Sequence, residues 1–188
     1  MKTEFEFTYF ADPKNFAYMH EGTPKCNFCG QEKECLDGDH FFGEEKIEAI
    51  CFKCMKEGML EELDISGNDC YVGALSGTEE ENKRTSREIT YCTPKLPTWQ
   101  DAEWPIKNGK AYKFLKIASK TDYIRNDNES EGKAMFIQSL HDNENDDFDW
   151  LWSMLPDQPV TNMKEGQYDL SFYLFTLNGE LLTIWDCN

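Results

Sequence analysis

Two Cys-x-x-Cys pairs are the residues in this sequence whose types and spacing best suit chemistry. Cys26 and Cys29 form the first pair, Cys51 and Cys54 form the second, and 21 residues separate the pairs. Each such turn lets two thiolates converge on one ion, and two turns complete a tetrahedral shell. Gly30, directly after Cys29, gives the backbone the freedom to curl around a metal. We therefore predict one structural zinc ion held by four cysteines.

Other uses of the paired cysteines stay open at this point. An iron–sulfur cluster or free thiols would employ the same residues, whereas a redox Cys-x-x-Cys usually occurs once beside a βαβ pattern. A disulfide framework would need a secreted protein, and the amino-terminal residues carry no apolar signal-peptide region. We therefore expect reduced thiols in the cytoplasm. Because four thiolates leave no open position for water, the expected zinc is structural rather than catalytic.

The remaining cysteines have no partner in the sequence pattern. We expect Cys35, Cys70, Cys92 and Cys187 to be small buried side chains. Cys35 and His40 lie between the two pairs, so either could replace one of the four metal ligands.

Composition and charge narrow the class of protein. The chain has 188 residues, 39% of them hydrophobic, which is enough for a packed core in a single domain spanning 1–188. Its 19 basic and 36 acidic residues give a formal net charge of −17, which argues against nucleic acid or anionic lipid as the main partner. No apolar stretch approaches the length needed to cross a membrane. Only three histidines are present, none in a catalytic motif, so we do not expect an enzyme.

Local patterns predict the elements that position these residues, and together they indicate an α+β fold. We expect a zinc-ribbon-like or treble-clef-like module over 23–63, packed on a mixed α+β domain that ends in a β-hairpin. Alternating aromatic residues favour a strand at 5–9, and Asn178-Gly179 between two apolar runs is typical of a hairpin turn. The other expected elements are a helix over 52–63 interrupted by Gly58, a short strand near 71–72, a helix from Thr78 to about Ile89, a strand over 111–117 and a helix or strand over 134–140.

An acidic segment over 119–149 offers a surface for a partner. A calcium loop starting at Asp142 fails because Gly is missing at its sixth position and Glu at its twelfth. The segment is either a solvated loop or a face that meets a basic protein. Trp150 lies off the apolar stripe formed by Phe148, Trp152 and Leu155, so it could be an exposed anchor. The candidate partner-binding residues are Asp142, Glu144, Asp146, Asp147, Asp149 and Trp150.

Several short motifs follow one another along the chain in a recognisable order. They are Phe7-Thr8-Tyr9-Phe10, Asp12-Pro13, Cys26-Asn27-Phe28-Cys29-Gly30, Glu44-Glu45, Ile50-Cys51-Phe52-Lys53-Cys54, Thr93-Pro94, Trp99-Gln100 with Trp104, Tyr173-Leu174-Phe175 and Asp186-Cys187. Taken together they resemble the CbrC-like family, which is known for colicin tolerance in enteric bacteria. The resemblance covers about residues 5–187 and is weakest over 120–165.

The chain departs from this family at two places where the family usually carries further cysteines. The first reads Lys107-Asn108 followed by Lys110 and Tyr112, and the second reads Thr176-Leu177-Asn178-Gly179. If those family residues form a second metal cluster, this chain lacks all of it. We therefore expect one zinc ion rather than two.

Two functions are consistent with these observations. The resemblance implies a protein of colicin-tolerance or immunity type, and the acidic charge fits the binding of a basic toxin such as a nuclease. The alternative is a zinc-ribbon accessory protein for nucleic acid or transcription, although such proteins carry basic residues around the metal. The sequence does not indicate an oligomeric state.

Overall fold

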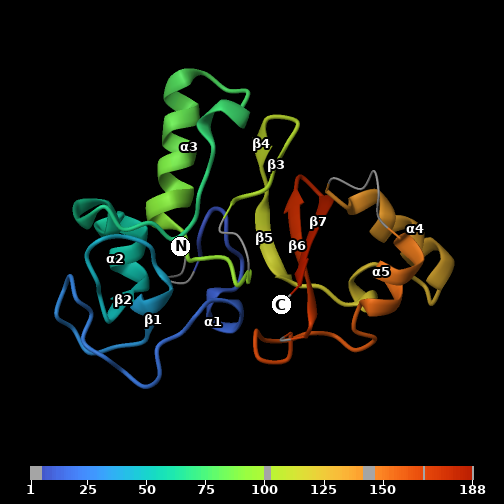
Figure 1. Ribbon diagram of the computed structural model, residues 1–188, viewed down its shortest axis with the longest axis horizontal. Helices are drawn as coiled ribbons and strands as arrows, with labels where there is room; N and C mark the ends of the chain where they lie inside the picture. The colour runs from blue at the N-terminus through green and yellow to red at the C-terminus, as the bar shows by residue number, and fades with distance from the viewer. Residues whose placement is uncertain (1–5, 100–102, 142–146, 167, 188) are drawn as a thin grey trace. The chain divides into compact units, whose positions relative to one another are not determined.

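The computed structural model describes residues 6–99, 103–141, 147–166 and 168–187, and its fold is mixed α+β (Figure 1). Two compact units form, one from Met1–Pro97 with Asp101–Ala111 and the other from Thr98–Gln100 with Tyr112–Asn188. We call them the first and the second unit.

The elements follow one another along the chain in a simple order. The helices are α1 (Pro13–Phe16), α2 (Phe52–Glu57), α3 (Glu79–Cys92), α4 (Glu129–Ser139) and α5 (Phe148–Met154). The strands are β1 (Cys35–Asp37), β2 (Ala49–Cys51), β3 (Ile106–Lys107), β4 (Lys110–Ala111), β5 (Lys113–Ile117), β6 (Leu170–Leu177) and β7 (Glu180–Cys187). Short 3-10 helices span Gly38–His40, Met59–Leu63, Val72–Ala74 and Lys120–Asp122.

The first unit is built around the antiparallel pair β1–β2, which places Cys35 opposite Cys51. Helix α2 follows β2 directly and ends at Gly58, whose φ of 76° lies in the left-handed region that favours glycine. The 3-10 helix Met59–Leu63 follows, so the predicted interruption of the helix at Gly58 is confirmed.

Helix α3 begins where the sequence predicts. The Thr78 hydroxyl accepts from the backbone N–H of Glu81, and the Glu81 carboxylate accepts from the N–H of Thr78, which is a capping box. The helix continues three residues beyond the expected Ile89. At its end the buried Asn68 amide donates to the carbonyl of Ile89, one of the last four helical carbonyls, and to those of Thr93 and Pro94 beyond the helix.

The second unit contains the antiparallel sheet β5-β6-β7, with β6 in the centre. The predicted hairpin is confirmed, and Asn178 and Gly179 adopt φ values of 51° and 87°, as a two-residue turn of this kind requires. Helices α4 and α5 lie beside this sheet (Figure 1). Phe136 of α4, Trp152 of α5 and Phe172 of β6 belong to one buried apolar cluster.

Three expectations about local structure are wrong. Residues 6–9 form no strand; Phe7 packs instead against Phe52, with ring centroids 6.1 Å apart. Residues 71–72 do not form a strand either, because a 3-10 helix begins at Val72. Cys187 is exposed, whereas Cys35, Cys70 and Cys92 are buried as expected. An alternating pattern alone cannot supply a neighbouring strand, and a residue at the end of an edge strand is open to water.

Within the part of the chain that the structure describes, no helix has the length and apolar character needed to cross a membrane.

Candidate metal centre

The first cysteine pair lies on a tight backbone turn. The N–H of Gly30 donates to the carbonyl of Cys26 at 2.8 Å, and the N–H of Cys26 donates to the carbonyl of Gln31 at 3.0 Å. Gly30 has a φ of 69°, so the turn uses a conformation that residues with a Cβ rarely adopt. This geometry directs Cys26 and Cys29 toward the same point.

The second pair is positioned by the junction between β2 and α2. Cys51 is the last residue of β2 and precedes the helix, and Cys54 lies in the first turn of α2. The expectation that Cys54 sits near a helix start is therefore confirmed.

The four sulfur atoms come together as a four-ligand site requires. All four Sγ atoms lie within 4.8 Å of one another, and those of Cys29 and Cys51 are 3.9 Å apart. Zinc–sulfur bonds of ~2.3 Å in a tetrahedron place the sulfurs about 3.8 Å apart. The spacing therefore suits a tetrahedral metal ion. Cys26, Cys51 and Cys54 are buried, and only Cys29 is exposed.

The protein environment favours a thiolate at Cys26. Burial opposes its ionisation, but hydrogen bonds from the backbone N–H groups of Cys29, Cys51 and Phe28 outweigh it and lower the pKa of Cys26 to about 7. The N–H of Cys51 lies 3.4 Å from the Cys26 sulfur. Burial raises the pKa values of Cys51 and Cys54, so these two thiols resist ionisation without a cation.

The two residues that could have replaced a ligand lie outside the cluster of close sulfurs. Cys35 is buried on β1, where burial, followed by the neighbouring Cys26 and Cys51, raises its pKa to about 12. His40 stacks on Tyr18 with ring centroids 3.6 Å apart, and its Nε2 lies 3.9 Å from Asp37. Among the described residues, the four paired cysteines form the one group of three or more potential ligands this close together.

Asn27 is a positioning residue that the sequence analysis missed. Its Oδ1 accepts from the N–H groups of Glu48 at 3.1 Å and Ala49 at 2.9 Å. These bonds tie the first cysteine turn to β2, which leads into the second cysteine pair. The signal that could have found it is an amide side chain placed inside the first Cys-x-x-Cys.

The proposed partner-binding residues divide into two groups. Asp142, Glu144 and Asp146 lie outside the described residues. Asp147 caps α5 by accepting from the N–H of Trp150 at 3.0 Å, and Asp149 in the first turn forms an ion pair with Lys133. Trp150 is 46% exposed and contacts Trp185 edge to face, with centroids 6.3 Å apart. The structure thus brings an exposed indole and two carboxylates to one end of α5.

The chain matches the family described as "Uncharacterised protein family (UPF0167)" over residues 5–175, and it belongs to that family. No curated protein and no solved structure matches the chain.

Proposed function

We propose that this protein is a non-enzymatic zinc protein of colicin-tolerance or immunity type that binds and neutralises a basic protein toxin. One zinc ion, held by the four paired cysteines, would stabilise the first unit, and the second unit would carry the toxin-binding face. The resemblance of the short sequence motifs to the CbrC-like family supports the tolerance role. The net charge of −17 supports a cationic partner.

Zinc is the metal that the donor set favours. Four thiolates in a tetrahedral arrangement select zinc or an iron–sulfur cluster over harder cations. A single ion fits the sulfur spacing, and a closed shell of four thiolates supports a structural role. None of the eight cysteines, all of which the structure describes, forms a disulfide, which supports a reducing compartment such as the cytoplasm.

The observation that carries the toxin-binding proposal is the exposed Trp150 beside Asp147 and Asp149. An indole that becomes buried on association lengthens the lifetime of a complex, whereas carboxylates around it accelerate the approach of a cationic partner. Met154, one turn further along α5, is also exposed and would extend the apolar contact.

The test is binding of the purified, metal-loaded protein to a panel of cationic nuclease toxin domains, measured by surface plasmon resonance at increasing salt. We expect association rates that fall steeply as salt screens the charges. The variant Asp147→Asn/Asp149→Asn should slow association, and Trp150→Ala should accelerate dissociation. Glu62→Gln/Glu80→Gln removes the same charge from exposed positions in the first unit and serves as the control.

Unchanged kinetics in both α5 variants would overturn the proposed face. Binding to short DNA or RNA at low salt, without binding to any basic domain, would instead favour the nucleic-acid accessory role.

A further inference from the structure

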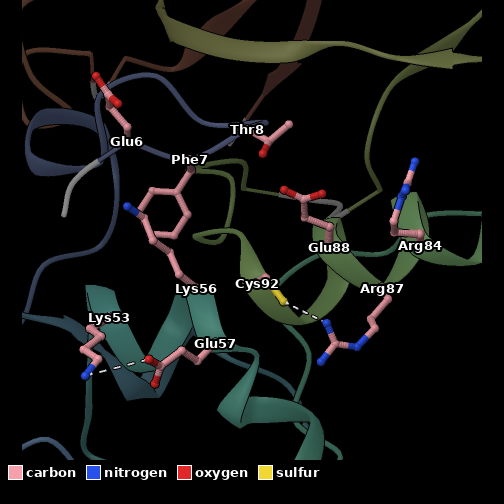
Figure 2. Close-up of a pocket in the computed structure, with 10 residues that line it drawn as sticks. All are labelled: Glu6, Phe7, Thr8, Lys53, Lys56, Glu57, Arg84, Arg87, Glu88 and Cys92. Carbon is pink, nitrogen blue, oxygen red and sulfur yellow. Dashed lines mark hydrogen bonds and ion pairs between the residues drawn. The ribbon is translucent and has the colours of Figure 1, made fainter. Parts of the chain in front are cut away.

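A surface pocket of about 550 Å³ in the first unit lies between α2 and α3 (Figure 2). The amino-terminal segment 6–8 contributes to its wall, and the Phe7 ring and the Cys92 thiol supply its apolar lining. Its size lies within the range typical of small-molecule sites. None of the four metal-binding cysteines lines it.

The lining of this pocket has more basic than acidic residues, whereas the whole chain has more acidic ones. The protein has 19 basic and 36 acidic residues, yet four cations and three carboxylates line this pocket. Lys53 and Lys56 come from α2, and Arg84 and Arg87 come from α3. Each pair is spaced i, i+3, so both members lie on the same side of their helix.

The four cations of the pocket differ in the ion pairs, hydrogen bonds and ring contacts that they already make. Lys53 lies 3.8 Å from the Glu57 carboxylate, and Arg87 donates to Glu61 at 2.7 Å. Lys56 Nζ lies over the Phe7 ring, 4.9 Å from its centroid, and Lys56 makes a further interaction in the structure. Within the described part of the chain, Arg84 makes no hydrogen bond and no ion pair, and its charge interacts only through space with Glu81 and Tyr9. An exposed guanidinium with its donors unused is therefore available at the pocket.

Arginine suits a phosphate because its planar fork of N–H donors matches two phosphate oxygens at once. A lysine ammonium adds a mobile point charge, so the two residue types together can hold a multiply charged anion. The carboxylate of Glu88, also in the lining, can accept hydrogen bonds from hydroxyl or amino groups elsewhere on the same ligand.

We propose that this pocket binds a small phosphate-bearing ligand, with Arg84 as the principal phosphate contact and Lys56 as the second. Lys53 and Lys56 flank Cys54 on α2, so the metal centre holds one wall of the pocket in place. The ligand site is distinct from the toxin-binding face proposed on α5.

The experiment uses the full-length, metal-loaded protein and inorganic pyrophosphate as the probe, followed by amide chemical shifts and calorimetry. We expect saturable binding below about 10 mM, with shifts concentrated at α2 and α3. Arg84→Gln should weaken binding by about tenfold, and Arg84→Gln/Lys56→Gln should weaken it further. Lys83→Gln is the matched control, because it removes the same charge from an exposed residue of α3 that pairs with Glu79 outside the pocket.

Absence of saturable binding, or equal weakening by Lys83→Gln and Arg84→Gln, would overturn the proposal. Circular dichroism of each variant is the check that it is folded. Toxin binding should be unchanged in Arg84→Gln, so failure of one proposal is distinguishable from failure of the other.

Discussion

Asn27 and Ala49 exchange two hydrogen bonds that join the first cysteine turn to β2. The N–H of Asn27 donates to the carbonyl of Ala49, and the Asn27 Oδ1 accepts from the N–H of Ala49, each at 2.9 Å. The two cysteine pairs are thereby held in place by protein contacts as well as by any bound metal.

Replacing Asn27 should therefore weaken metal binding although it is not a ligand. We expect Asn27→Ala to reduce zinc affinity by about 10- to 100-fold, as the loss of groups that orient metal ligands generally does. Competition with a chromophoric chelator measures this. Gln31→Ala is the control, because Gln31 is exposed and only its backbone carbonyl supports the turn. Equal affinities in the two variants would contradict the positioning role.

Removing one of the four paired cysteines should abolish stoichiometric metal binding. We expect the wild-type protein to contain one zinc per chain by elemental analysis, and Cys54→Ser to contain little. Structural zinc contributes on the order of 10 kcal/mol of apparent folding free energy, so this variant should also unfold at a much lower temperature. Cys187→Ser replaces an exposed thiol of the second unit and should keep its zinc. Full zinc content in Cys54→Ser would exclude the four-cysteine site.

Substituting Gly58 should destabilise the first unit for two reasons. Its φ of 76° strains any residue with a Cβ, and that Cβ would lie 2.8 Å from Arg87 Nη2 and 3.0 Å from the Cys92 sulfur. Gly22 has a φ of 74° and no atom within 4 Å of its Cβ position, so Gly22→Ala isolates the backbone strain of about 1–2 kcal/mol. We expect Gly58→Ala to cost about 1 kcal/mol more than Gly22→Ala in urea unfolding. A smaller loss in Gly58→Ala would show that Arg87 and Cys92 move aside freely.

A buried hydroxyl chain should contribute to the stability of the second unit. The Thr183 hydroxyl lies 2.7 Å from those of Tyr123 and Ser139, and Ser139 also donates to the carbonyl of Phe136. Tyr123→Phe leaves Thr183 with Ser139, so we expect a loss of about 1 kcal/mol. Thr183→Val removes the hydroxyl that bonds both Tyr123 and Ser139, so it should cost more, about 2–3 kcal/mol, in chemical denaturation. A larger loss of stability in Tyr123→Phe than in Thr183→Val would mean that Thr183 is not the central member of this hydroxyl network.

Patterns confined to a few neighbouring residues predicted much of the fold correctly. The hairpin at Asn178-Gly179 follows from the backbone conformation that these two residue types tolerate. The helix start at Thr78 follows from a capping interaction with a residue only three positions away. The exposure of Trp150 follows from helical periodicity over 148–155. The strand expected at 5–9 failed over its described residues because strand formation also needs a partner strand, which alternation cannot provide.

Residue type and spacing alone were sufficient to identify the four cysteines that lie together, since each Cys-x-x-Cys turn is local and thiolates share a preference for one kind of ion. Three-dimensional folding decided the rest. It paired Asn27 with Ala49, left His40 and Cys35 outside the sulfur cluster, and brought cations from α2 and α3 to one pocket. The Asn27–Ala49 contact and the approach of the α2 and α3 cations at the pocket join residues 22 to 34 positions apart, and their distances depend on how the elements pack.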